Sequence, residues 1–168
     1  MVAEASKVQI RPAIAADNLE IFGLIQALAT YENLTVTGSA ANLADDLFGA
    51  FPAAEAIVAE DLELGKLVGF VLFFANYSTF LTRPGIHLED LFVLPQYRRQ
   101  GIGKSLIAAV AQVAIARNCA RLEWSVLDWN SLAIDFYRGL GAEVLPDWRI
   151  CRVTGTGLTN LAGAALAD

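Results

Sequence analysis

Residues 86–103 read Ile-His-Leu-Glu-Asp-Leu-Phe-Val-Leu-Pro-Gln-Tyr-Arg-Arg-Gln-Gly-Ile-Gly. The apolar run Ile86 to Val93 predicts a strand, which Pro95 stops. Helical spacing of apolar residues follows from Gly103 to Asn118, and Arg121 to Val126 then alternates as a strand does. The stretch therefore predicts a strand, a loop with two glycines and a helix, followed by a further strand.

The rest of the chain supplies the other elements. Upstream we expect a strand at Lys7 to Pro12, a helix capped by Asp17 that runs through Tyr31, a shorter helix around Leu43 and Leu47, and hairpin strands at Ala56 to Asp61 and Leu67 to Ala75. Downstream we expect a helix at Ser131 to Leu140, a last strand at Trp148 to Val153, and an Ala/Gly-rich tail from Thr154 that is poorly ordered or docked on a partner. This order predicts one α+β domain over residues 1–168, with its core at 7–153, a tail at 154–168, and helices on both faces of a sheet.

Composition limits the classes of partner. Eighteen acidic and twelve basic residues give a net charge of −6, which argues against nucleic acid as a ligand. Cys119 and Cys151 lack the spacing of a disulfide framework or a zinc cluster, so no metal is expected. Neither a signal-peptide pattern nor an apolar run of about 18 residues is found. We therefore expect a cytoplasmic protein without a membrane partner.

The glycine loop has the chemistry of an anion site. Backbone N–H groups at Gly101 and Gly103 are not shielded by a Cβ, and the following helix directs the positive end of its dipole at the loop. Arg98, Arg99 and Lys104 add charge suited to a diphosphate or a 3′-phosphate. The spacing matches neither an ATP-binding Gly-x-x-x-x-Gly-Lys-[Ser/Thr] loop nor a dinucleotide-binding Gly-x-Gly-x-x-Gly loop. A coenzyme A pyrophosphate fits this chemistry.

Three motifs resemble those of the GCN5-related N-acetyltransferases: Leu88-Glu89-Asp90-Leu91-Phe92-Val93, Tyr97-Arg98-Arg99-Gln100-Gly101-Ile102-Gly103, and Trp129-Asn130-Ser131 with Phe136-Tyr137. Within that superfamily the chain is similar to the diamine acetyltransferases of the spermidine/spermine and thialysine type, through Tyr31-Glu32, Leu88-Glu89-Asp90 and Asp128-Trp129-Asn130. The resemblance implies a mixed, mostly antiparallel sheet of six to seven strands that separates between strands four and five. It also implies about four flanking helices, acetyl-CoA in the opening, and a homodimer.

The resemblance assigns roles to individual residues. Tyr137 would be the acid that protonates the coenzyme A sulfur, and Glu89 the base that accepts the proton of the amine through water. The residues implied for acetyl-CoA are Leu91, Phe92, Val93, Arg98, Arg99, Gln100, Gly101, Ile102, Gly103, Lys104, Ser105, Asn130 and Tyr137. Pantetheine would pair with the backbone at Phe92 and Val93, and the Val93 N–H would polarise the thioester carbonyl. The residues implied for the amine are Tyr31, Glu32, Asp90 and Trp148.

Several of these roles have a structural alternative. Glu89 and Asp90 could be a polar strand stretch or ion-pair partners of Arg98 or Arg99. Adjacent strand residues point to opposite faces, so the two carboxylates are not expected to line one site equally. Asn130 could instead belong to the N-terminus of a helix. The structural alternative for Tyr137 is a place in the core, for Trp148 a place in the core or at a dimer interface, and for Tyr31 and Glu32 a solvated helix end.

The implied reaction is transfer of an acetyl group to a primary amine of a small molecule, a diamine, a polyamine or a thialysine-like amino acid, by direct attack in a ternary complex. The segment Asn76-Tyr77-Ser78-Thr79-Phe80, expected to be a loop, lacks the acidic residue and the tryptophan of the animal polyamine enzymes. This difference favours a shorter amine or a lysine analogue over spermidine. The alternatives are a peptide or protein N-acetyltransferase and a non-catalytic acetyl-CoA sensor.

Overall fold

The computed structural model describes residues 7–164. The chain forms two compact units, Met1–Leu127 and Asp128–Asp168. Within the described residues, the first unit holds the sheet and three α-helices, and the second holds two α-helices. One domain over residues 1–168 stays a prediction.

The first unit is built on a five-stranded sheet with the strand order β1-β2-β3-β4-β5. Its strands are β1 (Val8–Pro12), β2 (Glu55–Asp61), β3 (Lys66–Ser78), β4 (Arg83–Val93) and β5 (Leu122–Trp124). Each of the pairs β1–β2, β2–β3 and β3–β4 is antiparallel, and β5 is parallel to β4. The mixed, mostly antiparallel sheet is confirmed, and the expected number of six to seven strands is wrong.

The strand expected at Trp148 to Val153 is not formed. Residues 148–153 adopt no regular structure, and the Trp148 side chain is 75% exposed. An apolar segment becomes a strand only when a neighbouring strand completes its ladder of hydrogen bonds. No strand pairs with this segment in the part of the chain that the structure covers.

The hairpin of β3 and β4 is longer than expected. Asn76, Tyr77 and Ser78, which we expected in a loop, pair with residues 83–85 of β4. Gly85 permits the close approach, because a Cβ at this position would lie 2.5 Å from the Asn76 side-chain oxygen. The turn is thereby confined to residues 79–82.

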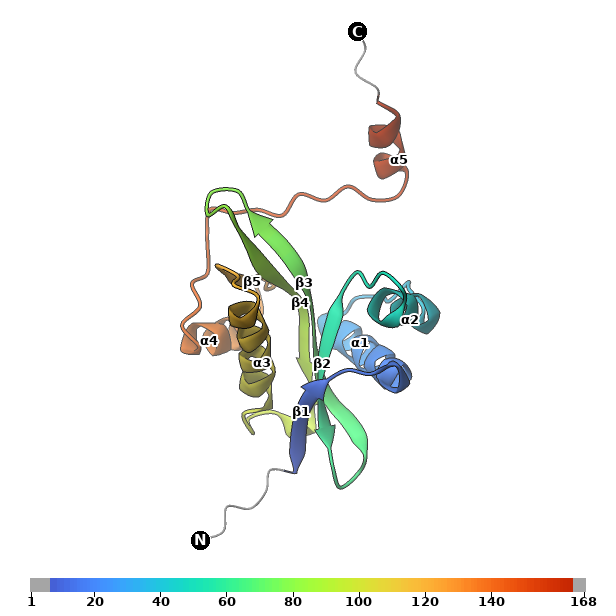
Figure 1. The fold of residues 1–168 in the computed structure, drawn as a ribbon, viewed down its shortest axis with the longest axis vertical. Coiled ribbons are helices and arrows are strands. Elements are labelled where there is room, and N and C mark those ends of the chain that lie inside the picture. The colour runs from blue at the N-terminus through green and yellow to red at the C-terminus, as the bar shows by residue number, and fades with distance from the viewer. Residues whose placement is uncertain (1–6, 165–168) are drawn as a thin grey trace. The chain divides into compact units, whose positions relative to one another are not determined.

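Helices cover both faces of the sheet, as expected (Figure 1). Helices α1 (Asn18–Glu32) and α2 (Ala40–Phe48) lie on one face, and α3 (Ile102–Ala116) lies on the other. The α1 face buries a cluster at helical spacing, Ile21, Leu24 and Leu28, together with Phe70 and Phe92 of the sheet. The α3 face buries Val71, Leu106 and Val110 completely.

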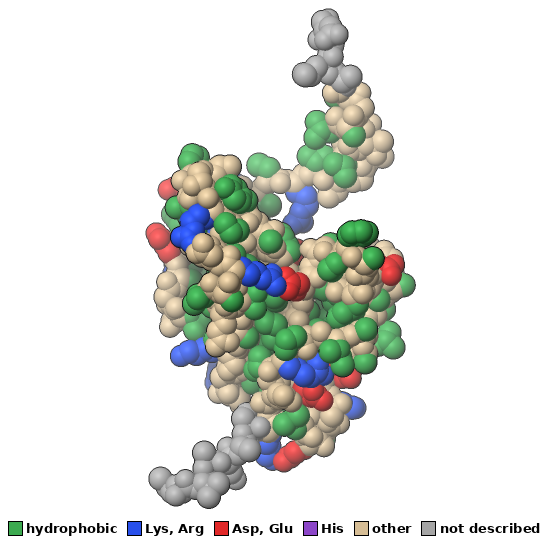
Figure 2. Space-filling model, viewed as in Figure 1, with side chains coloured by type: hydrophobic (Ala, Val, Ile, Leu, Met, Phe, Trp, Pro, Cys, Tyr) green, Lys and Arg blue, Asp and Glu red, His purple; other side chains and the backbone are tan. Residues whose placement is uncertain are grey.

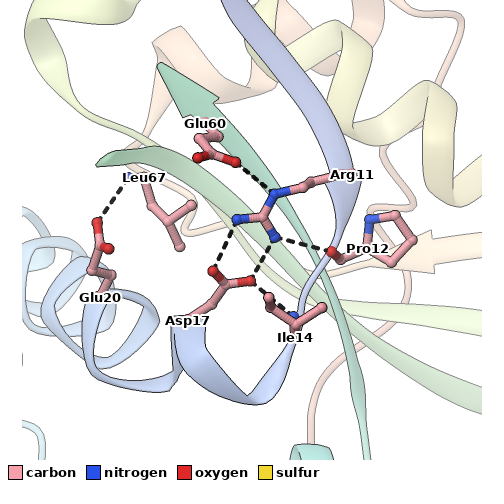
Figure 3. Close-up of polar contacts among 7 residues, drawn as sticks. All are labelled: Arg11, Pro12, Ile14, Asp17, Glu20, Glu60 and Leu67. Carbon is pink, nitrogen blue, oxygen red and sulfur yellow. Dashed lines mark hydrogen bonds and ion pairs between the residues drawn. The ribbon is translucent and has the colours of Figure 1, made fainter. Parts of the chain in front are cut away.

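Polar contacts fix the start of α1 to the sheet (Figure 3). The Arg11 guanidinium donates two hydrogen bonds to the Asp17 carboxylate, at 2.6 and 2.9 Å, and its Nε donates a third to Glu60 at 2.6 Å. Asp17 was expected to cap α1, but its side chain makes no capping bond to that helix and accepts instead from the Ile14 N–H. The Leu67 N–H donates to Glu20 at 2.8 Å, which ties the first turn of α1 to β3.

Strands β4 and β5 separate, as expected. Their pairing begins at Ile86 with Leu122 and ends at Leu88 with Trp124. Residues 89–93 of β4 therefore have β3 on one side and no strand on the other, among the strands that the structure describes. This uncovered edge is where the candidate site begins.

The second unit contains α4 (Ser131–Gly139) and α5 (Thr156–Gly163). We expected about four helices, and α5 is the fifth. It lies in the tail that was expected to be poorly ordered or docked on a partner, and all eight of its residues are exposed. The last part of that tail, residues 165–168, lies outside the described residues.

Charged groups of both signs share the surface. On the face in Figure 2, Lys and Arg side chains lie beside Asp and Glu side chains, with hydrophobic side chains between them. On this face the net negative charge of the chain is not collected in one region. Among residues 7–164, no helix has the length and apolar character needed to cross a membrane.

Candidate active site

The uncovered edge of β4 presents backbone hydrogen-bonding groups. The Leu94 N–H donates to Val68 O at 2.9 Å, and Val93 lies opposite Gly69. In an antiparallel ladder this pattern marks Val93 and Gly69 as a non-hydrogen-bonded pair, so the Val93 N–H and C=O point away from β3. The same alternation turns the Leu91 backbone to the uncovered edge and the Phe92 backbone towards Phe70. Leu91 and Val93 can therefore pair with a ligand there, and Phe92, which we expected in this role, pairs with β3.

A β-bulge places Glu89 and Asp90 on the same face of the sheet. Leu72 pairs with Asp90 and Phe73 pairs with Leu88, which leaves Glu89 as the extra residue of β4. Directly paired residues share a face, so Asp90 lies on the face of Leu72. Glu89 lines a pocket on that same face, together with Leu72. The expectation that these two carboxylates point to opposite faces is wrong, because a bulge interrupts the alternation.

The pocket beside Glu89 has a volume of about 470 Å³. The sheet contributes Leu72, Phe74 and Glu89 to its lining. The other lining residues come from α2 and the segment after it: Leu43, Asp46, Leu47, Ala53 and Ala54. The walls are thus apolar, with one carboxylate from the sheet and one from α2.

At this site the charges of two carboxylates, Glu89 and Glu32, act on a third, Asp90. Burial, and to a lesser extent the negative charges of Glu89 and Glu32, raise the pKa of Asp90 to about 6. Burial also raises the pKa of Glu32, which lies in the last turn of α1. The ion pair that Glu89 forms is with His87, at 3.8 Å, and no ion pair of the described residues joins Glu89 or Asp90 to Arg98 or Arg99. The cluster therefore offers negative charge that the neighbouring arginines do not neutralise.

Arg98 connects this strand with the end of α1. Its Nε donates to Val93 O at 3.0 Å. The guanidinium carbon lies 4.7 Å from the centre of the Tyr31 ring and 5.5 Å from the centre of the Phe92 ring. Both distances are those of cation–π contacts. Tyr31 is 38% exposed, and its neighbour Glu32 lies close enough to Asp90 to raise the pKa of that carboxyl group.

The glycine loop has the geometry that an anion needs. Gly101 is the residue before α3 and has φ +82°, a conformation that favours glycine, and Arg99 also has positive φ. No side chain caps α3, so the N–H groups of Ile102, Gly103 and Lys104 are available to a ligand. The Arg99, Gln100, Lys104 and Ser105 side chains are exposed. A diphosphate therefore fits this helix end.

A hydrogen bond holds the start of this loop to the sheet. The Tyr97 hydroxyl donates to Asp61 at 2.7 Å, and Asp61 also accepts the Glu63 and Leu64 N–H groups at the turn between β2 and β3. The loop is thus anchored at both ends, by Tyr97 and by the buried Ile102 of α3.

Three of the expected site residues belong to the second unit. The Asn130 side chain accepts a hydrogen bond from the Ala133 N–H at 3.2 Å and caps α4. This is the helix N-terminal place that we gave as the alternative to a contact with the cofactor. Tyr137 is buried in α4, with its ring centre 5.3 Å from that of Phe136. Trp148 is exposed, so it is not a core residue in this unit. The roles of these three residues at the site stay predictions.

Apart from Glu89, the pocket walls are formed by residues that belong to none of the sequence motifs. Leu72 and Phe74 come from β3, and Leu43, Asp46 and Leu47 from α2. The spacing of the α2 residues at i, i+3 and i+4 is a signal for one helix face, but it does not say which strand that face meets. Among residues 7–164, no group of three or more His, Cys, Asp or Glu side chains could hold a metal ion.

Comparison with known proteins identifies relatives across most of the chain. Residues 24–142 match the family model of the Acetyltransferase (GNAT) family. A thialysine N-epsilon-acetyltransferase of Bos taurus is 41% identical over 167 residues, covering 93% of this chain and 98% of that protein. The L-ornithine N5-acetyltransferase NATA1 of Arabidopsis thaliana is 46% identical over 107 residues, 64% of this chain and 47% of the plant protein. The match thus spans about half the length of the plant enzyme.

A solved structure extends the likeness to the fold. An integron cassette protein from the mobile metagenome of V. cholerae superimposes with a TM-score of 0.78 at 27% identity, covering 95% of this chain and 100% of the other. The fold is thus shared with a protein of known structure.

Proposed function

Because the chain belongs to the acetyltransferase (GNAT) family and is an acyltransferase, we propose that it transfers an acetyl group from acetyl-CoA to a primary amine of a small molecule. The acceptor is a diamine, a polyamine or a thialysine-like amino acid. The observation that carries the proposal is the position of Glu89 and Asp90 on one face of β4 at its uncovered edge, with Glu32 close enough to raise the pKa of Asp90.

The residues of this chain fit acetyl-CoA. The N–H groups at the start of α3 would bind the diphosphate, with Arg99 and Lys104 as counter-charges, and the Leu91 and Val93 backbone would pair with the pantetheine. Gln100, Ile102, Gly103, Ser105 and Asn130 complete the set proposed for this contact. When bound, acetyl-CoA supplies the acetyl group as a reactive thioester. The Val93 N–H is positioned to donate a hydrogen bond towards a carbonyl at that edge.

The carboxylates would hold and deprotonate the amine. Asp90, with Glu32, attracts an ammonium group, and Glu89 accepts a proton through a water molecule so that the amine nitrogen has a free electron pair. That nitrogen forms the new bond to carbon in a ternary complex while the carbon–sulfur bond breaks. The Tyr137 hydroxyl, in our proposal, gives its proton to the departing sulfur.

The choice of acceptor follows from the pocket and the relatives. A pocket with apolar walls and carboxylates suits a carbon chain that carries ammonium groups. Relatives that act on thialysine and on ornithine support an amino-acid-like amine, and the lack of an acidic residue and a tryptophan in residues 76–80 supports a short one. A homodimer in the cytoplasm, with Trp148 at the acceptor site, also belongs to this proposal and rests on the resemblance.

The test is release of the coenzyme A thiol from acetyl-CoA in the presence of putrescine, spermidine, thialysine, lysine, ornithine or an aminoglycoside. We expect the highest kcat/KM with thialysine or ornithine, and a large loss of kcat in Tyr137→Phe. Turnover dominated by spermidine would contradict the acceptor class. Binding of acetyl-CoA without turnover of any amine would favour a protein substrate or a sensor, and no binding would overturn the proposal.

A further inference from the structure

Arg98 is the first residue of the glycine-loop motif, and its sequence position suggested a contact with the diphosphate. Its side chain has other partners in the structure. The Nε–H is engaged by Val93 O at 3.0 Å, and the guanidinium lies over the faces of Tyr31 and Phe92. Arg98 is also half-buried, whereas Arg99 and Lys104 are exposed.

We propose that Arg98 is a positioning residue for the amine site, which holds the last turn of α1 against β4 and contributes little to binding the diphosphate. The inference rests on the proposed function and names a residue that tunes the affinity of the same site for amines.

The geometry explains how such a residue would act. Tyr31 and Glu32 are adjacent in the last turn of α1, so the position of Tyr31 determines where the Glu32 carboxylate lies relative to Asp90. The first turn of α1 is already fixed, by Glu20 to Leu67 and by Asp17 to Arg11 (Figure 3). At the other end of the helix, the contact of Tyr31 with Arg98 provides a link to β4.

The charge of Arg98 is compatible with this role. A guanidinium stacked on aromatic rings keeps its charge while it makes a planar, directional contact, which an ammonium group does not reproduce. Among the described residues the Arg98 guanidinium forms no ion pair with Glu89 or Asp90. The positioning residue therefore leaves the carboxylates available for the amine.

The experiment compares Arg98→Met with the matched variant Lys104→Met in the full chain. Calorimetry gives the Kd of acetyl-CoA, and initial rates at saturating acetyl-CoA give the KM of the best amine. We expect Arg98→Met to raise the amine KM about tenfold and to change the acetyl-CoA Kd less than about threefold. Lys104→Met should raise the acetyl-CoA Kd and leave the amine KM nearly unchanged. An Arg98→Met variant that weakens acetyl-CoA as much as Lys104→Met does would overturn the inference.

A second measurement does not depend on turnover. In NMR spectra the Arg98 Nε–H resonance should be shifted upfield by the Tyr31 ring, with slow exchange because Val93 O accepts the proton. Tyr31→Leu should remove the upfield shift and Tyr31→Phe should retain it. In the kinetic assay, Arg98→Lys, which keeps the charge but not the planar group, should recover less than half of the amine affinity that Arg98→Met loses. A resonance unaffected by Tyr31→Leu would refute the inference even if no amine were acetylated.

Discussion

Glu89 and Asp90 share one face of the sheet because β4 has one more residue than β3 at this point. The bulge brings two negative charges together, and burial of Asp90 then raises its pKa to about 6. A carboxyl group with this pKa changes charge near neutral pH, which suits a site that must attract an ammonium ion and then release a neutral product. The arrangement costs stability, and that cost can be measured.

Asp90→Asn should stabilise the protein at neutral pH. Above pH 6 the folded state carries a buried charge that disfavours folding, whereas below about pH 4 Asp90 is neutral in both states. The stability cost of Asp90 therefore develops as the pH rises from about 4 to 6. We expect Asp90→Asn to raise Tm at pH 7.5 by roughly 2–6 °C, an effect on the order of 1–2 kcal/mol that fades towards pH 4, while the amine KM increases. Calorimetric scans at four pH values test this, and a constant difference in Tm would contradict it.

Glu89→Gln should slow the reaction and leave cofactor binding intact. Loss of a general base lowers kcat by about 10²-fold or more, because the amine keeps its proton. The Glu63→Gln variant is a suitable control, since Glu63 is exposed on the turn between β2 and β3. Steady-state rates and acetyl-CoA titrations measure both effects. A loss of kcat below twofold would assign the base to another group.

Sequence reasoning found the residues of this site but not their orientation. The identities of Glu89, Asp90 and Glu32 were predicted from motifs, and the structure brings these carboxylates together. Alternation along β4 gave the wrong faces, because a bulge depends on the register with β3, which is not encoded locally. The contact of Arg98 with Tyr31 joins residues 67 positions apart and likewise has no local signal.

At the scale of the elements, the hairpin of β3 and β4 carries the site. Its two strands approach closely at Gly69, opposite Val93. The order of helices and strands up to β5 follows from periodicity and from glycine and proline positions, and was predicted with boundary shifts of a few residues. The last expected strand failed because Trp148 to Val153 has the apolar pattern but no pairing partner in the described chain.

Gly69→Ala should destabilise the hairpin. A Cβ at this position would lie 2.9 Å from the Phe92 carbonyl oxygen and 3.2 Å from Val93 Cγ2, so the backbone must move. We expect the free energy of unfolding to fall by about 1–3 kcal/mol, and acetyl-CoA to bind more weakly because the Val93 backbone shifts. Gly23→Ala is the matched control, since nothing lies within 4 Å of its Cβ in α1. Gly23→Ala should raise the free energy of unfolding by about 0.5–1 kcal/mol, because alanine favours the helix more than glycine does. Urea titrations of both variants measure this, and equal midpoints would refute it.

At the scale of the whole molecule, two arginine–carboxylate pairs link separate elements of the first unit: Arg11 and Asp17 are six residues apart in the chain, and Arg117 and Glu55 are 62 apart. Arg11 binds Asp17 with side chains that are 22% and 8% exposed, whereas Arg117 and Glu55 are each 44% exposed. Hydrogen bonds from these arginines lower the pKa of Asp17 and of Glu55. Both pairs therefore stabilise the folded state at neutral pH, whereas the buried charge of Asp90 destabilises it.

The protein should become less stable in acid, because protonation of Asp17 and Glu55 removes these ion pairs. Their contribution is present above the ordinary carboxyl pKa and is lost as the pH falls through the lowered values, so Tm should fall between about pH 5 and 3. Arg11→Met should flatten this slope at any salt concentration. Arg117→Met should do so at low salt only, since 1 M NaCl screens an exposed pair. Scans of Tm against pH at two salt concentrations test the distinction, and equal salt sensitivity of the two variants would contradict it.

The uncovered edge of β4 also bears on how the protein behaves in concentrated solution. A row of unpaired backbone groups is a template on which another chain can add a strand, which is a common route to aggregation. The segment at risk is short, residues 89–93, and begins with two acidic residues that repel a second copy. A ligand that pairs with Val93 would take the place of a neighbouring strand and shield this edge. If acetyl-CoA binds as proposed, we expect purified protein to aggregate more slowly when coenzyme A is added.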